Sequence, residues 1–187
     1  MSRDSTTSVT HLTTEKLTAG LDEVRRSPKE DGVLEMIVSR PGVNEREVLE
    51  EAELNAEVGL VGDSWSARGT ATWNPHPSMQ IAIMNSRAAA LVAQNKDRWP
   101  LAGDQLYIDW YLGPENLPPG TQFTLGSATL EVTDQPHVAC VKFVERFGQA
   151  ASDLVGSPVG RELNLRGIYT RVVQPGVVRV GDIANRV

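Results

Sequence analysis

Cys140 is the one side chain in this 187-residue sequence whose chemistry stands out, because it is the only cysteine. It closes the segment Gln135-Pro136-His137-Val138-Ala139-Cys140, where a predicted strand over 128–133 gives way to a predicted helix over 141–151. A cysteine at the start of a helix lies near free backbone N–H groups and the positive end of the helix dipole, which stabilise a thiolate. His137 or Lys142 would add positive charge. The position therefore predicts a thiol that is nucleophilic near neutral pH.

The neighbours of Cys140 leave a second interpretation open. On a regular helix, Lys142 points about 200° away from Cys140 and Arg146 also lies off its face, so only His137 is well placed locally. A lone cysteine between alanine and valine is also typical of a small buried hydrophobe. In either case a single thiol excludes an internal disulfide and a zinc site built from several thiolates of one chain.

Basic residues are concentrated at the C-terminal end of the chain. Residues 137–187 hold 7 basic and 4 acidic side chains, a net charge of +3, whereas the whole chain carries −6. Most of these cations are arginines, which bind carboxylates and phosphates in a bidentate manner. An anionic small ligand suits this end, and scattered, solvated arginines are an equally good interpretation. Nucleic acid is disfavoured, because the chain as a whole is acidic and the arginines form no run.

Several large enzyme classes are disfavoured because the sequence lacks their characteristic motifs. The sequence contains no Gly-x-Gly-x-x-Gly dinucleotide loop, no phosphate loop ending in Gly-Lys-Ser/Thr, no Gly-x-Ser-x-Gly elbow and no His-Glu-x-x-His pair. The histidines, His11, His76 and His137, are too far apart to form a local metal motif.

The elements that would position Cys140 are mostly short strands. Apolar and β-branched residues predict strands over 32–39, 80–84, 105–109, 121–125, 128–133, 168–173 and 177–183. Gly126-Ser127 and Gln174-Pro175-Gly176 predict hairpin turns. Helices are expected from Ser86 to about Asn95 and, from the spacing of Val141, Val144, Phe147 and Ala151, over 141–151. Residues 44–54 are ambiguous, with Asn44 a candidate helix cap. Few helices and no regular alternation of strand and helix favour a mixed barrel.

The composition predicts one globular domain behind a short arm. With 40% hydrophobic and 22% charged residues, the chain has an ordinary globular composition. Residues 1–30 are rich in Ser and Thr, and only Leu17, Leu21 and Val24 have helical spacing, so we expect a flexible N-terminal arm with one short helix and a domain over 31–187. No apolar run approaches the roughly 20 residues of a membrane helix or resembles a secretory signal, so we expect a cytoplasmic protein without membrane partners.

Four segments, taken in order, resemble the MOSC domain, which is named for the C-terminal domain of molybdenum cofactor sulfurase. They are the hairpin 125–133, the motif Pro136-x-x-x-Cys140, the segment Arg166-Gly167-Ile168-Tyr169-Thr170-Arg171-Val172, and Val178-Arg179-Val180-Gly181-Asp182. Gly59-Leu60-Val61-Gly62-Asp63 and residues 80–92 agree more loosely, so the resemblance spans about residues 33–184. The order of the set is more specific than any one segment.

The resemblance implies a β-rich α+β fold, a MOSC-type β-barrel with a few peripheral helices. It also implies binding of the molybdenum cofactor, a molybdopterin that carries a phosphate, and a role in sulfur handling. Cys140 stands where the family cysteine carries sulfur as a persulfide, or binds molybdenum when the cofactor is present. His137 would be the second catalytic residue. The cofactor-binding residues that it suggests are Lys142, Arg146, Arg171, Arg179 and Asp104. Pyridoxal phosphate binding is a further function associated with the family.

The chain departs from the family pattern at two places. Many members have Pro-Arg-x-Pro-Cys, where this sequence has Pro136-His137-Val138-Ala139-Cys140. Many have Gly-Glu-Asn-Leu, where this sequence has Gly103-Asp104-Gln105-Leu106. Both changes fall on residues expected to lie at the cofactor.

Two hypotheses about function follow. In the first, the protein binds the molybdenum cofactor and relays sulfur through Cys140, or reduces N-hydroxylated compounds with an external redox or sulfur-donor partner. It predicts an accessible cleft that unites Cys140, His137 and basic residues. In the second, the protein is a non-catalytic module of the same fold that binds an anionic ligand or a partner protein. That hypothesis predicts a buried, inert cysteine and a cleft without convergent polar groups.

Overall fold

The core of the protein is a closed, mixed β-barrel. The computed structural model describes residues 9–68 and 75–187. Seven strands pair in the circular order β1-β11-β7-β8-β9-β5-β6, and β6 pairs with β1 to close the barrel. The barrel strands are β1 (Gly32–Ser39), β5 (Ile81–Asn85), β6 (Leu106–Asp109), β7 (Gln122–Leu125), β8 (Ala128–Val132), β9 (Ile168–Gln174) and β11 (Ile183–Arg186). Only β5 and β6 pair in parallel among these described strands. This confirms the predicted β-barrel class.

A smaller sheet and an added strand lie beside the barrel. Strand β2 (Glu47–Leu49) pairs with the end of β1, while β3 (Glu51–Asn55) pairs with both β4 (Gly59–Leu60) and β10 (Gly176–Arg179). Residues 44–54, ambiguous in sequence, are therefore mainly strand, and Asn44 caps no helix. The predicted hairpin around Pro175 is wrong, because β10 pairs with β3 and leaves β9 to pair with β5 and β8.

Alternation along the strands creates two apolar clusters. Residues that point into the barrel, such as Ile83, Ile108 and Phe123, are fully buried and form one cluster. Residues that point outward from the same strands, such as Met84 and Tyr107, pack under the helices. Because successive side chains of a strand face opposite sides, β5 and β6 contribute to both clusters and are buried on both faces.

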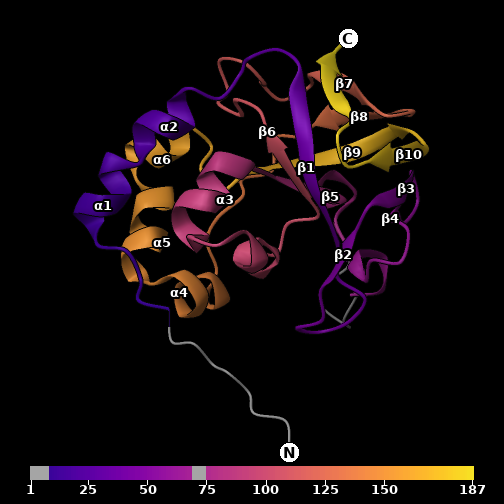
Figure 1. The fold of residues 1–187 in the computed structure, drawn as a ribbon. Helices are drawn as coiled ribbons and strands as arrows, with labels where there is room; N and C mark the ends of the chain where they lie inside the picture. The colour runs from indigo at the N-terminus through magenta and orange to yellow at the C-terminus, as the bar shows by residue number, and fades with distance from the viewer. Residues whose placement is uncertain (1–8, 69–74) are drawn as a thin grey trace, which may run out of the picture.

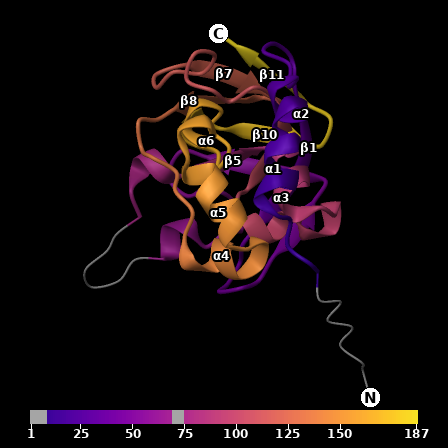
Figure 2. The same ribbon diagram turned by 90° about the vertical axis from the view of Figure 1, so that its left-hand side faces the viewer.

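Helices cover one side of the barrel, as Figures 1 and 2 show. They are α1 (Thr14–Ala19), α2 (Leu21–Arg25), α3 (Ser86–Ala93), α4 (Val141–Phe147), α5 (Gln149–Gly156) and α6 (Pro158–Glu162). Short 3-10 helices are η1 (Trp65–Ala67), η2 (Pro77–Met79) and η3 (Lys96–Ala102). None of the helices in the described ranges is long and apolar enough to span a bilayer.

The segment expected to be a flexible arm is packed on the protein from Thr14 onward. Leu17, Leu21 and Val24 are each at most 3% exposed and belong to the cluster under the helices. Helical spacing predicted their common face, but two helices form instead of one, with Gly20 between them. The expectation of a flexible arm is therefore wrong for Thr14–Arg25, because this face covers apolar surface on α3 and α5.

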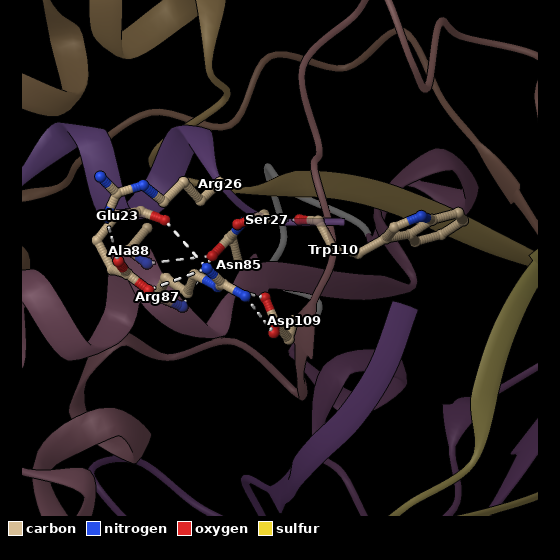
Figure 3. A network of polar contacts seen from close by, with 8 residues as sticks. All are labelled: Glu23, Arg26, Ser27, Asn85, Arg87, Ala88, Asp109 and Trp110. Atoms are coloured by element: carbon tan, nitrogen blue, oxygen red, sulfur yellow. Dashed lines mark hydrogen bonds and ion pairs between the residues drawn. The ribbon is translucent and has the colours of Figure 1, made fainter. Parts of the chain in front are cut away.

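Polar contacts also fasten α2 to the barrel (Figure 3). The Asn85 side chain accepts from the backbone of Arg87 and Ala88, which caps α3, and donates to Ser27 and to the Trp110 carbonyl. Arg87 forms a bidentate pair with Asp109, at 2.7 and 2.9 Å, and a further pair with Glu23 of α2. Asn85, and not the predicted Ser86, is the cap residue of this helix.

The helix after Cys140 is shorter than predicted and buries only part of the predicted face. It ends at Phe147, because Gly148 adopts φ +91°, and α5 begins at the next residue. Phe143 and Phe147 are each 1% exposed and their rings lie 4.9 Å apart, whereas Val141 is 74% exposed. Of the predicted apolar face, Phe147 and Ala151 are buried, but Phe143 is buried in place of Val141, since an aromatic ring buries more apolar surface than a valine side chain.

Candidate functional site

A cavity of about 500 Å³ lies at the end of the barrel where Cys140 is found. Its walls come from the loop after β1, the segment around η1, the end of η3, the segment 137–146, and β9. Cationic side chains are its most frequent feature, and they are Arg40, Arg46, Arg68, Lys142, Arg146 and Arg166. No Asp or Glu of the described residues lines it. The cavity is therefore suited to an anion of the size of a small-molecule ligand.

The C-terminal end of η3 orients most of these arginines. Four consecutive backbone carbonyls each accept a hydrogen bond from a different arginine: Pro100 from Arg46 (3.1 Å), Leu101 from Arg146 (2.8 Å), Ala102 from Arg166 (2.9 Å) and Gly103 from Arg40 (2.8 Å). Carbonyls in the last turn of a helix carry its negative dipole end and mostly lack partners within the helix, although the Pro100 carbonyl also accepts from the Gly103 N–H at 3.2 Å. Gly103 ends η3 with φ +93°, which a residue with a Cβ adopts only with strain. We call residues 100–103 the carbonyl arc.

Two of the arginines that bind the carbonyl arc are also paired with buried carboxylates. Arg40 forms a bidentate pair with Asp63, at 2.8 and 2.9 Å, and Asp63 also accepts from the Arg40 backbone. Arg166 donates to Asp104 at 2.7 Å. All four of these side chains are at least nine-tenths buried. These pairs are rigid parts of the cavity wall, and they contribute little net charge to it.

The other four cations have no carboxylate partner among the described residues: Arg46, Arg68, Lys142 and Arg146. Burial lowers the pKa of Arg46, and the neighbouring Arg146, Arg40 and Arg68 lower it further. The pKa of Arg68 is lowered by burial and by Arg40. Burial is the main cause of both shifts and neighbouring arginines add to it, so a bound anion would favour the charged form of both side chains.

Asn44 also lines the cavity and connects two of these cations. Its Oδ1 accepts from Lys142 Nζ at 3.2 Å and from Arg146 Nη2 at 3.3 Å. Asn44 has φ +61°, a conformation that asparagine tolerates better than most residues. The loop after β1 and helix α4, which are far apart in sequence, thus meet at the cavity.

Cys140 lines the cavity and is exposed to solvent. It is the residue before α4, with extended backbone (φ −104°, ψ 173°), and its carbonyl accepts from the Phe143 N–H at 2.9 Å. Because Cys140 precedes the helix, the angle between side chains on a regular helix does not apply to it. Lys142 and Arg146 line the same cavity, although helical geometry predicted that they point away. The interpretation of Cys140 as a buried hydrophobe is wrong.

His137 lines this cavity, and the Asp104 side chain lies next to it without lining the cavity. His137 stacks on Tyr169 with ring centroids 4.2 Å apart, and its side chain is 5% exposed. Its Nδ1 lies 3.6 Å from Asp104 Oδ1, and neither atom has a hydrogen-bond partner in the described part of the chain. Burial, followed by Arg166 and Arg40, holds the pKa of His137 well below its ordinary value. His137 is therefore neutral near pH 7 and cannot supply the positive charge expected of it.

Asp104 supports the cavity without lining it. Its side chain is fully buried and holds Arg166, and burial raises its pKa although Arg166 opposes that shift. Tyr169, the ring under His137, also lines the cavity, and burial followed by Asp104 raises its pKa. These groups form a buried layer that fixes the position of Arg166 and His137.

The structure brings together only part of the predicted set of site residues. Cys140, His137, Lys142 and Arg146 line the cavity. Arg171 pairs with Glu131 at 2.8 Å and Arg179 with Glu51 at 2.5 Å, both outside it.

Four lining cations were not among the predicted residues: Arg40, Arg46, Arg68 and Arg166. Three of them lie in the N-terminal part of the chain, which has a net negative charge, so a count of charges along the sequence does not indicate a cationic site there. The one local signal is that Arg40 directly follows an apolar strand, where a charged side chain needs a partner. No group of three or more His, Cys, Asp and Glu side chains within 9–68 and 75–187 forms a metal site.

Comparisons with known proteins agree with this fold. A family model described as the MOSC domain matches residues 76–184. A comparison with curated proteins finds no match. Among solved structures, the YuaD protein from Bacillus subtilis superposes with a TM-score of 0.59 and 17% identity, over 82% of this chain and 94% of that one. YiiM from Escherichia coli gives 0.54 and 20%, over 83% and 69% of the two chains. YiiM from Geobacillus stearothermophilus gives 0.56 and 16%, over 83% and 75%.

Proposed function

The chain belongs to the MOSC domain family, which is associated with the molybdenum cofactor and with sulfur, and from this premise we propose that its cationic cavity binds the molybdenum cofactor next to Cys140. The observation that carries the proposal is the position of an exposed thiol in the wall of a cavity lined by six Lys and Arg side chains. In this proposal Cys140 carries sulfur for the cofactor or binds its metal.

The residues present fit such a group. A phosphate dianion suits Arg46, Lys142 and Arg146, which lack carboxylate partners among the described residues and converge on Asn44 and the carbonyl arc. Thiolate sulfur is a soft ligand and suits molybdenum. Arg166 Nε is buried without a hydrogen-bond partner in the described part of the chain, and its side chain lines the cavity. When bound, the cofactor would supply a redox-active metal centre.

The chain's own residues would have separate roles. Arg46, Lys142 and Arg146 bind the anionic part of the ligand. Arg40 and Arg166, each held by a buried carboxylate, keep the wall rigid, so little ordering is needed on binding. His137, neutral and stacked on Tyr169, offers an uncharged nitrogen beneath the ligand.

The geometry favours this proposal over a non-catalytic module. The module hypothesis expects a buried cysteine and no convergent polar groups, whereas Cys140 is exposed and the cations converge. Sulfur carriage is favoured over reduction of N-hydroxylated compounds, because the accessible thiol is what the site itself offers. Pyridoxal phosphate carries the same phosphate, but it would leave Cys140 without a role, so we do not propose it.

Cofactor content tests the proposal. The protein is purified from a host that makes the molybdenum cofactor, and the pterin released on denaturation is measured together with molybdenum. We expect wild type and the matched control Arg171→Gln to retain pterin, and the double variant Arg46→Gln, Arg146→Gln to lose it while keeping its thermal unfolding midpoint. Wild type without pterin, or a folded double variant that retains it, would contradict the proposal.

A further inference from the structure

We infer that Cys140 takes its sulfur from a small oxyanionic sulfane compound of the thiosulfate class, which the cationic cavity binds. This inference rests on the sulfur-carrying role proposed above for Cys140 and names the donor for that role. The donor would occupy the cavity before the cofactor does.

The charge of the cavity is the first observation behind this inference. Four cations that line the cavity lack a carboxylate partner among the described residues, and they are Arg46, Arg68, Lys142 and Arg146. Besides burial, the charges of Arg146, Arg40 and Arg68 each lower the pKa of Arg46. This field attracts small dianions and raises their concentration at the thiol.

An unpartnered buried donor is the second, independent observation. The Arg166 side chain is 8% exposed, and its Nε has no hydrogen-bond partner in the described part of the chain, although Asp104 and Ala102 satisfy the other nitrogens. A buried polar group without a partner is costly, and a ligand oxygen is one way to satisfy it. Arg166 and Cys140 line one cavity, so an oxyanion bound there would bring an acceptor oxygen into the cavity that holds the thiol.

The chemical step uses only these groups and the donor. The Cys140 thiolate attacks the outer sulfur of thiosulfate, a bond forms between Sγ and that sulfur, and the bond to the SO₃ group breaks. The bonding electron pair leaves with sulfite, so that the products are a Cys140 persulfide anion and a sulfite dianion, and total charge is unchanged. The thiol proton goes to solvent when the thiolate forms, and the exposed position of Cys140 gives it that path. No added oxidant or reductant is required.

The same cations would lower the barrier to this step. As the sulfur–sulfur bond breaks, negative charge moves onto the departing sulfite. Preorganised guanidinium groups stabilise charge that develops in this way, and they need no reorganisation when the carbonyl arc already orients them. A persulfide borne on another protein would release a thiolate outside the cavity and gain less from them.

Persulfide formation with two donors tests the inference. The full-length protein, freed of bound pterin and reduced, is mixed with thiosulfate or with cysteamine persulfide, which is a cationic donor. Addition of one sulfur atom to Cys140 is followed by intact-protein mass spectrometry in wild type, in Arg46→Gln, Arg146→Gln, and in the control Arg171→Gln. We expect both donors to load wild type and the control. We expect the double variant to react with thiosulfate about tenfold more slowly or worse, and with cysteamine persulfide no more slowly than wild type.

Each other outcome overturns the inference. If cysteamine persulfide loads Cys140 but thiosulfate does not, or if the folded double variant reacts with thiosulfate at the wild-type rate, then the donor is not a bound oxyanion, although Cys140 still carries sulfur. If no donor loads Cys140, its sulfur-carrying role fails as well. Cofactor retention is measured separately and is not affected by these results.

Discussion

Nδ1 of His137 lies 3.6 Å from Oδ1 of Asp104, and neither atom has a hydrogen-bond partner in the described part of the chain. Asp104 directs its other oxygen to Arg166, so the histidine is left in a buried site between an ion pair and the Tyr169 ring. Histidine here keeps the site neutral and makes it sensitive to acid.

Stability should therefore decrease below about pH 6.5. The pKa of His137 is depressed in the folded protein, so the unfolded chain binds its proton first as the pH falls. The free energy of unfolding should fall by up to about 1.4 kcal/mol per pH unit until the folded pKa is reached. The raised pKa of Asp104 acts in the opposite direction, because there the folded state binds its proton first. Denaturant unfolding at about pH 7 and about pH 5 measures the balance.

His137→Gln should reduce this loss of stability in acid. Glutamine does not titrate and still offers polar atoms to Asp104. The exposed His11 gives the matched control, His11→Gln, which should keep the wild-type pH dependence. An unchanged slope in His137→Gln would mean that His137 does not remain neutral in the folded state.

Pyrophosphate should stabilise the protein through the cavity. At about ten times its dissociation constant, a ligand that binds only the folded state adds about 1.4 kcal/mol, which raises the unfolding midpoint of a chain of this size by about 3 °C to 6 °C. Arg146→Gln should remove most of this shift, because Arg146 has no carboxylate partner among the described residues. Arg179→Gln, whose side chain pairs with Glu51 outside the cavity, should retain it in differential scanning fluorimetry.

Phe143→Ala should destabilise the protein by about 3–5 kcal/mol, because the buried ring packs on Phe147 and under the Arg166 guanidinium. The same variant should slow anion-dependent reactions of Cys140, since α4 carries the thiol at its start. Val141→Ala is the control, and it should change the free energy of unfolding by less than about 0.5 kcal/mol. A larger loss in Val141→Ala than in Phe143→Ala would indicate that Val141 is buried, as the sequence predicted.

Leu17→Ala tests whether α1 is part of the folded core. The side chain is 1% exposed within the cluster under the helices, so its truncation should cost about 2–5 kcal/mol in chemical denaturation. The exposed neighbour Lys16, changed to alanine, should have little effect. A flexible arm would make both substitutions equally neutral.

Local pattern predicted the strands well and long-range pairing poorly. β1 was predicted over its full extent, because Gly32–Ser39 is apolar and bounded by turn residues. The partner of β10 could not be predicted, since pairing with β3 joins segments more than 100 residues apart. The choice of Phe143 over Val141 as the buried face depends on which surface the barrel offers, which no helical spacing specifies.

The sequence predicted the part of the candidate site whose residues are close together in the chain. Cys140, His137, Lys142 and Arg146 fall within one short segment and line one cavity. Arg171 and Arg179 were predicted as site residues because the C-terminal end of the chain is basic. Alternation along their strands instead directs their side chains toward Glu131 and Glu51. Arg40, Arg46 and Arg68 depend on the carbonyl arc and on loop geometry, which appear only in three dimensions.

The most direct measurement is the rate at which Cys140 reacts with anionic iodoacetate compared with neutral iodoacetamide. An accessible thiol inside a field of unpaired cations should give a ratio about tenfold above that of free cysteine at low ionic strength. Added salt should bring the ratio down, because exposed charges are screened. A ratio equal to or below that of free cysteine, unchanged by salt, would contradict the account.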